Sequence, residues 1–60
     1  MTPGQAVRVP AEPALGVLVV VSVYLAPDAA LAGQEVTWAM CSTNGKRPGR
    51  SFRVSELEAT

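Results

Sequence analysis

The sequence has no histidine, a single cysteine and only three aromatic residues among its 60 positions. Without histidine, the chain lacks the commonest general base and the usual partner of a serine or cysteine nucleophile. Cys41 alone cannot form an internal disulfide, and a structural zinc site would have too few ligands. We therefore expect no enzymatic activity, no cofactor, no metal site and no small-molecule substrate. An unpaired thiol favours a reducing, cytoplasmic location.

A long apolar run and a net charge are also absent. The longest uncharged run, Pro13 to Pro27, is 15 residues long, whereas a helix that crosses a bilayer needs about 20. We therefore expect no membrane association. Five basic and five acidic residues balance, so the molecule as a whole has no net field that attracts nucleic acid.

A signal peptide is an alternative interpretation of the N-terminal half. Arg8 precedes an apolar segment, and Ala30 to Ala32 have the small side chains of a cleavage pattern. Removal of such a leader would leave only 28 residues from Gly33 onward, which are too few for a stable core without metal or disulfide. One domain over residues 1–60 is the preferred interpretation.

What the chain does contain is strand-forming sequence. Four segments have the alternation or the β-branched composition of short strands: Gln5 to Val9, Val17 to Leu25, Glu35 to Cys41 and Ser51 to Val54. A helix through Ala14 to Ala32 is the alternative for the second segment, but its valine density and Pro27 oppose it. Asn44-Gly45 predicts a hairpin turn. We expect an all-β domain of four to five short antiparallel strands, with one short helical turn near Ser55 to Leu57.

The alternation also predicts which side chains face inward. Val36, Trp38 and Met40 share one side of their strand, and Phe52 is expected to join them in the core. The other side is expected to form an apolar patch on the surface. Its members are Leu18, Val20 and Tyr24 from one strand and Ala39 and Cys41 from the next.

This apolar patch is the first candidate site. Monomers rarely leave large apolar patches exposed to water, so it indicates self-association or a protein partner. The alternative is that a terminal segment or the connection 27–34 covers it within one chain. On this interpretation the protein is a small interaction module, a homo-oligomer or the ligand of another protein.

A basic cluster is the second candidate site. It comprises Lys46, Arg47, Arg50 and Arg53, which fall within eight positions. Small β-barrels often bind nucleic acid through a cationic loop with exposed aromatic side chains, so an alternative function is that of a nucleic-acid-binding accessory protein. A solvated hairpin tip that discourages edge pairing is the simpler interpretation, since Tyr24 alone is left for stacking.

The order of these segments is similar to that of a known family. It consists of Gly4 to Val9, a proline-containing loop, Val17 to Val23, Val36 to Trp38, a Gly/Lys hairpin and Phe52 to Glu58. This order resembles small bacterial SH3-like barrel proteins of the YodC type. The resemblance implies a five-stranded, strongly bent barrel, and it implies no activity, because the family has none assigned.

Overall fold

The computed structural model describes residues 1–60 and consists of five strands and three single 3-10 turns. The strands are β1 (Ala6–Arg8), β2 (Leu18–Asp28), β3 (Gln34–Ser42), β4 (Arg50–Arg53) and β5 (Glu58–Ala59), and the turns are η1 (Pro13–Leu15), η2 (Ala29–Leu31) and η3 (Val54–Glu56). They form one sheet in the order β4-β3-β2-β1-β5, with every neighbouring pair antiparallel. The predicted all-β fold is confirmed. The helical alternative for residues 14–32 is wrong, and no helix has the length and apolar character that a bilayer crossing requires.

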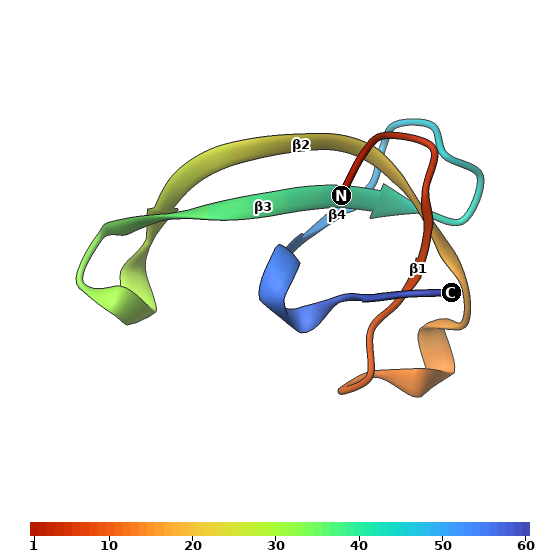
Figure 1. Ribbon diagram of the computed structural model, residues 1–60, viewed down its shortest axis with the longest axis horizontal. Helices are drawn as coiled ribbons and strands as arrows, with labels where there is room; N and C mark the ends of the chain where they lie inside the picture. Colours follow the sequence, from red (N-terminus) through yellow and green to blue (C-terminus); the bar gives the residue numbers. More distant parts are fainter.

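The hairpin of β2 and β3 reaches beyond the rest of the sheet (Figure 1). Its pairing runs from Val19 opposite Ser42 to Asp28 opposite Gln34. The neighbouring strands cover only its inner half, because β1 pairs with residues 18–19 and β4 with residues 38–41. Residues 22–37 therefore form a largely two-stranded projection, which we call the arm.

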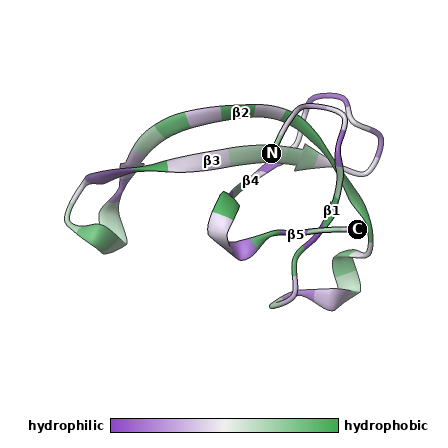
Figure 2. Cartoon of the chain, in the orientation of Figure 1, coloured by the Kyte–Doolittle hydropathy of each residue, from purple (hydrophilic) through white to green (hydrophobic).

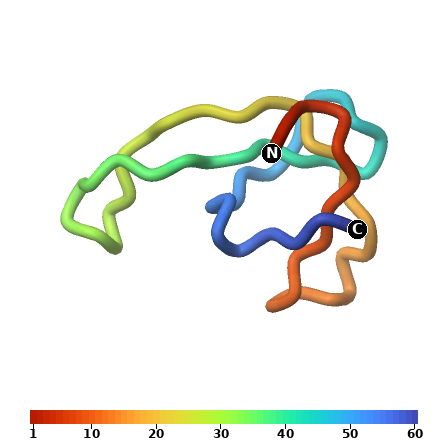
Figure 3. Tube along the Cα trace, in the orientation of Figure 1, coloured from red at the N-terminus to blue at the C-terminus, as the bar shows by residue number.

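The last residues of the chain form the edge of the sheet opposite β4. Figure 3 shows the last residues running beside β1, where Val7 pairs with Ala59 and Arg8 with Glu58. The sequence allowed for a fifth strand but did not locate this one, which is only two residues long. Leu57, just before it, packs against the core.

A β-bulge in β2 decides which of its side chains enter the core. The register passes from Val20 opposite Cys41 to Ser22 opposite Met40, which leaves Val21 as the extra residue. A bulge interrupts the alternation of side chains along a strand. As a result Val20 before the bulge and Val23 after it both contribute to the core, although they are three positions apart.

The predicted inward side of β3 is wrong. Ala39 and Cys41 are 0% and 1% exposed, whereas Trp38 and Met40 are only half buried. Ala39 pairs with Phe52 across the sheet, and its small side chain leaves room for the phenyl ring, which is 4% exposed as expected. On the outer face, Trp38 donates its indole N–H to the carbonyl of Ala26 at 3.0 Å, so the polar atom of this half-buried ring has a partner.

The resulting core is small. Figure 2 shows hydrophobic residues where β1 and β2 cross and mostly hydrophilic ones in the loop between β3 and β4. Only eight of the 60 residues are buried, and a chain of this size removes only about 60% of its unfolded surface from water. We therefore expect a marginally stable domain. The buried apolar residues are Val7, Val9, Leu18, Val20, Ala39, Cys41 and Phe52.

Candidate functional site

The structure does not bring the five predicted interface residues together on the surface. Four of them lie in the core: Leu18, Val20, Ala39 and Cys41. Tyr24 lies on the opposite face, across from Trp38, and donates its hydroxyl to the Oγ of Ser51 at 2.5 Å. The prediction of an exposed patch is therefore wrong, for two reasons. The bulge in β2 turns Tyr24 to the face opposite Leu18 and Val20, and β3 turns Ala39 and Cys41 toward the core.

Cys41 is a packing residue in this structure. Its thiol is buried, and burial raises the pKa of the thiol, so the reactive thiolate is disfavoured. Its Sγ donates a weak hydrogen bond to the carbonyl oxygen of Ala39, at 3.8 Å. No three side chains of the types that commonly bind metal ions lie together.

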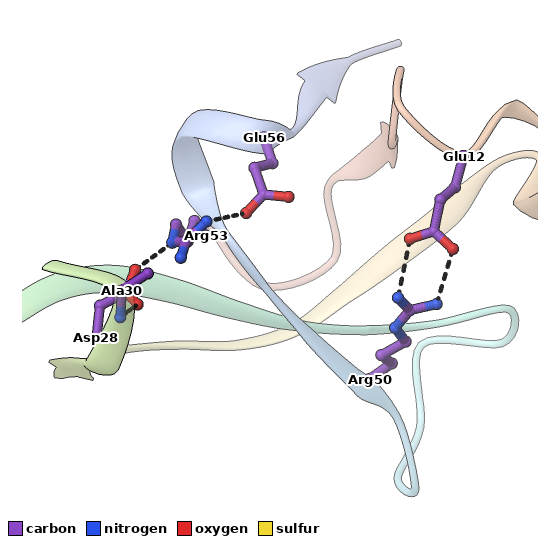
Figure 4. Close-up of polar contacts among 6 residues, drawn as sticks. All are labelled: Glu12, Asp28, Ala30, Arg50, Arg53 and Glu56. Carbon is purple, nitrogen blue, oxygen red and sulfur yellow. Dashed lines mark hydrogen bonds and ion pairs between the residues drawn. The ribbon is translucent and has the colours of Figure 1, made fainter.

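Arg50, from the predicted basic cluster, is bonded to a carboxylate that lies far from it in the sequence. Its guanidinium donates two parallel hydrogen bonds to Glu12, at 3.1 and 2.9 Å (Figure 4). The same guanidinium lies over the ring of Phe52, 4.9 Å from its centroid. Sequence reasoning missed this pair because the two partners are 38 positions apart in the chain.

Arg53 is held by two carboxylates. It donates to Asp28 at the end of β2 and, at 3.0 Å, to Glu56 in η3 (Figure 4). The hydrogen bond from Arg53 lowers the pKa of the Asp28 carboxyl, and a second bond from the backbone N–H of Ala30 acts in the same direction. Asp28 is 4% exposed, so this ion pair fastens the far end of the arm to the last residue of β4.

Lys46 and Arg47 are left without a carboxylate partner. They lie in the connection between β3 and β4, residues 43–49, which we call the cation loop. Asn44 holds this loop by accepting hydrogen bonds from the backbone N–H of Lys46 at 3.0 Å and from the Ser42 hydroxyl at 3.1 Å. Gly49 packs so closely that an added Cβ would lie 2.6 Å from the carbonyl oxygen of Cys41.

A cleft of about 310 Å³ lies under the cation loop. Its apolar lining includes Leu15 from η1, Leu18 and Phe52, and three cations, Lys46, Arg47 and Arg50, also line it. No carboxylate is among the lining residues. Sequence reasoning identified these cations but not the apolar wall beside them, because the fold brings Leu15 to the loop from a distant part of the chain.

The outer edge of β2 is a further surface that the sequence analysis missed. Val20 is the last residue of β2 bonded to the N-terminal segment, through Gly4 and Gln5 at 2.8 and 2.9 Å. From residue 22 to residue 28 this edge has no neighbouring strand, and we call it the free edge. It carries no charge before Asp28, and Leu25 on it is 66% exposed.

These surfaces belong to a small all-β domain with a five-stranded antiparallel sheet. Comparison with protein-family models, curated proteins and solved structures found no match to the chain. The resemblance to small SH3-like barrels of the YodC type therefore stays a prediction from the order of the sequence segments.

Proposed function

We propose that the protein is a non-enzymatic interaction module that self-associates through the free edge of β2. The observation that carries this proposal is a run of strand backbone, residues 22–28, with pairing on one side only. The one free thiol, that of Cys41, suits a reducing compartment such as the cytoplasm.

The chemistry of the free edge favours strand pairing. In an antiparallel ladder the backbone N–H and C=O groups of alternate residues point away from the existing partner and are ready to bind another strand. Soluble proteins usually block such edges with charged side chains, proline or a covering segment. Here Pro27 is the one such device before Asp28, and the preceding side chains from Val21 to Ala26 are uncharged.

A second copy of the chain is the occupant that this edge fits best. Two identical strands can pair antiparallel about a two-fold axis, which makes each contact self-complementary. A register centred on Leu25 keeps the pairing within the free edge. It places Tyr24 of one copy opposite Ala26 of the other and Asp28 opposite Ser22, and it brings no like charges together. The pairing would also bury more apolar surface, which a domain with so few buried residues lacks.

Nucleic-acid binding by the basic cluster has less support. Arg50 and Arg53 are bonded to carboxylates, and Lys46 and Arg47 remain as cations free to contact phosphates. The half-buried Trp38 lies beneath Arg53, 5.8 Å from its guanidinium, rather than on an open stacking surface. The nucleic-acid alternative stays a prediction.

Sedimentation equilibrium over a range of protein concentrations tests the proposal. We expect a monomer–dimer equilibrium for the wild type and a monomer for Leu25→Lys, because a charge in the paired edge must be desolvated. The matched control is Leu31→Lys, which places the same charge on η2, where the leucine is 48% exposed. We expect the control to dimerise like the wild type, and Leu25→Lys to raise Kd at least about tenfold, or about 1.4 kcal/mol.

Far-UV circular dichroism shows whether each variant keeps its strands. A wild type that stays monomeric at every concentration would refute the proposal. So would equal dissociation of the two lysine variants, because association would then not depend on the free edge.

A further inference from the structure

We propose that the cleft under the cation loop binds a small aromatic carboxylate, a function separate from pairing at the free edge. The cleft combines an apolar wall with two cations, Lys46 and Arg47, that have no carboxylate partner. These two features suit the two ends of such a ligand. The free edge belongs to the arm, whereas the cleft lies where β3 ends.

Charge favours an anion at this place. Every ion pair of the molecule involves Arg50 or Arg53, so Lys46 and Arg47 both keep their charges available. No carboxylate is in the lining, and Glu12 offsets only the charge of Arg50, so the charges of Lys46 and Arg47 remain in excess around the cleft. A carboxylate entering there gains charge-assisted hydrogen bonds without displacing an existing acidic partner of those two residues.

Size and shape favour a small molecule with an apolar body. At about 310 Å³ the cleft is at the lower end of ligand pockets, which span about 300–1,000 Å³. Phe52 and Leu18 on its wall are core residues, and the cation loop is held by Asn44 and by the close packing of Gly49. The wall and the loop are therefore in place before a ligand arrives, and little ordering is needed on binding.

Glu12 limits the strength of this site. Its carboxylate occupies both donor positions of Arg50 that face it, so it competes with a ligand for that guanidinium. Both side chains of the pair are largely exposed, at 62% and 43%, and exposed pairs contribute little to stability. Releasing Arg50 should therefore strengthen anion binding without unfolding the chain.

Calorimetric titration with 2-naphthoate as the probe tests the proposal, with the neutral 2-naphthalenemethanol as the matched ligand. We expect naphthoate to bind and the alcohol to bind more weakly. Arg47→Gln should weaken naphthoate binding about threefold to tenfold. The control Arg8→Gln removes the same charge from an exposed arginine on β1, outside the cleft, and should change little.

A second pair of variants separates the cleft from general electrostatics. Glu12→Gln should tighten naphthoate binding severalfold because it frees Arg50, whereas Glu35→Gln, with the same change in net charge, should not. Equal effects within either pair of variants, or equal binding of acid and alcohol, would overturn the proposal. Binding of a single-stranded oligothymidylate in place of naphthoate would overturn it too, and would favour the nucleic-acid alternative. These outcomes do not depend on the oligomeric state, so they are distinct from a failure of edge pairing.

Discussion

Phe52 should contribute more to the stability of the fold than Trp38, although the size of the indole and the sequence pattern suggest the opposite order. Phe52 is the one aromatic side chain buried in the core, whereas the larger Trp38 is half buried on the outer face. We therefore predict that Phe52→Ala destabilises the fold much more than Trp38→Ala. The opposite order is expected if Trp38 faces inward.

The magnitudes follow from what each side chain contacts. Replacing a buried phenylalanine by alanine costs about 3–5 kcal/mol. A domain of 60 residues has a total stability of about 3–9 kcal/mol, so Phe52→Ala should unfold a large fraction of the molecules in water. Trp38→Ala removes a hydrogen bond to Ala26 and a cation–π contact with Arg53, which together contribute about 2 kcal/mol. The loss of apolar contacts of the half-buried indole adds to this cost, but the outer face leaves no closed cavity.

Urea unfolding followed by far-UV circular dichroism measures both effects. The experiment is best done at low protein concentration, so that association of the folded chain does not add to the measured stability. Phe52→Leu keeps most of the buried volume and should cost less than about 1.5 kcal/mol, which provides a folded reference. If Trp38→Ala proves as destabilising as Phe52→Ala, the assignment of the two faces of the sheet is wrong.

Two further predictions concern the cation loop and the end of the arm. Gly49→Ala should destabilise the fold by about 1–3 kcal/mol in thermal unfolding, because the added Cβ would lie 2.6 Å from the Cys41 carbonyl oxygen. The control Thr43→Ala, at an exposed position of the same loop, should change the stability little. An unchanged stability of Gly49→Ala would show that the loop is free to move. The hydrogen bond from Arg53 lowers the pKa of Asp28 in the folded state below the ordinary value of 3.8. The ionised carboxylate therefore contributes its full stabilisation at pH values above 3.8. This stabilisation is lost as the pH falls through the lower pKa of the folded state. Asp28→Asn should therefore show a shallower loss of stability in that acidic range than the wild type, and parallel pH profiles of the two proteins would contradict the assignment.

Local sequence signals were sufficient for the first four strands. The β-branched residues of β2 and the alternation in β3 located both strands within a few residues, because these signals depend on neighbours in the chain. Pro27 limited the predicted length of β2, yet the strand continues through it to Asp28. This is possible because β2 has a single neighbour at that point, and edge strands tolerate a residue without a backbone N–H.

The assignment of faces failed for reasons that local pattern does not contain. β2 is apolar on both sides, so nothing in its composition marks Val21 as the extra residue of a bulge. In β3 the largest side chain was taken as the inward one, whereas the space opposite Phe52 accepts only the small Ala39. A shift by one residue turns every side chain of a strand to the other face, and so the predicted interface was lost with it.

The candidate sites were recognised only in part. The sequence located the cations of the loop, because they are close together in the chain. It could not show that Arg50 and Arg53 have carboxylate partners 38 and 25 residues earlier, in Glu12 and Asp28. These long-range pairs, rather than the number of positive charges, decide which cations are available to a ligand.

The ion pair between Asp28 and Arg53 has a mechanical consequence for the arm. A two-stranded ribbon anchored at one end would sway about its base, but this one is also tied near its tip to Arg53, the last residue of β4. This second attachment restrains the angle between the ribbon and the body. Two such molecules could meet almost as rigid bodies, and little motional freedom would remain to be lost on docking.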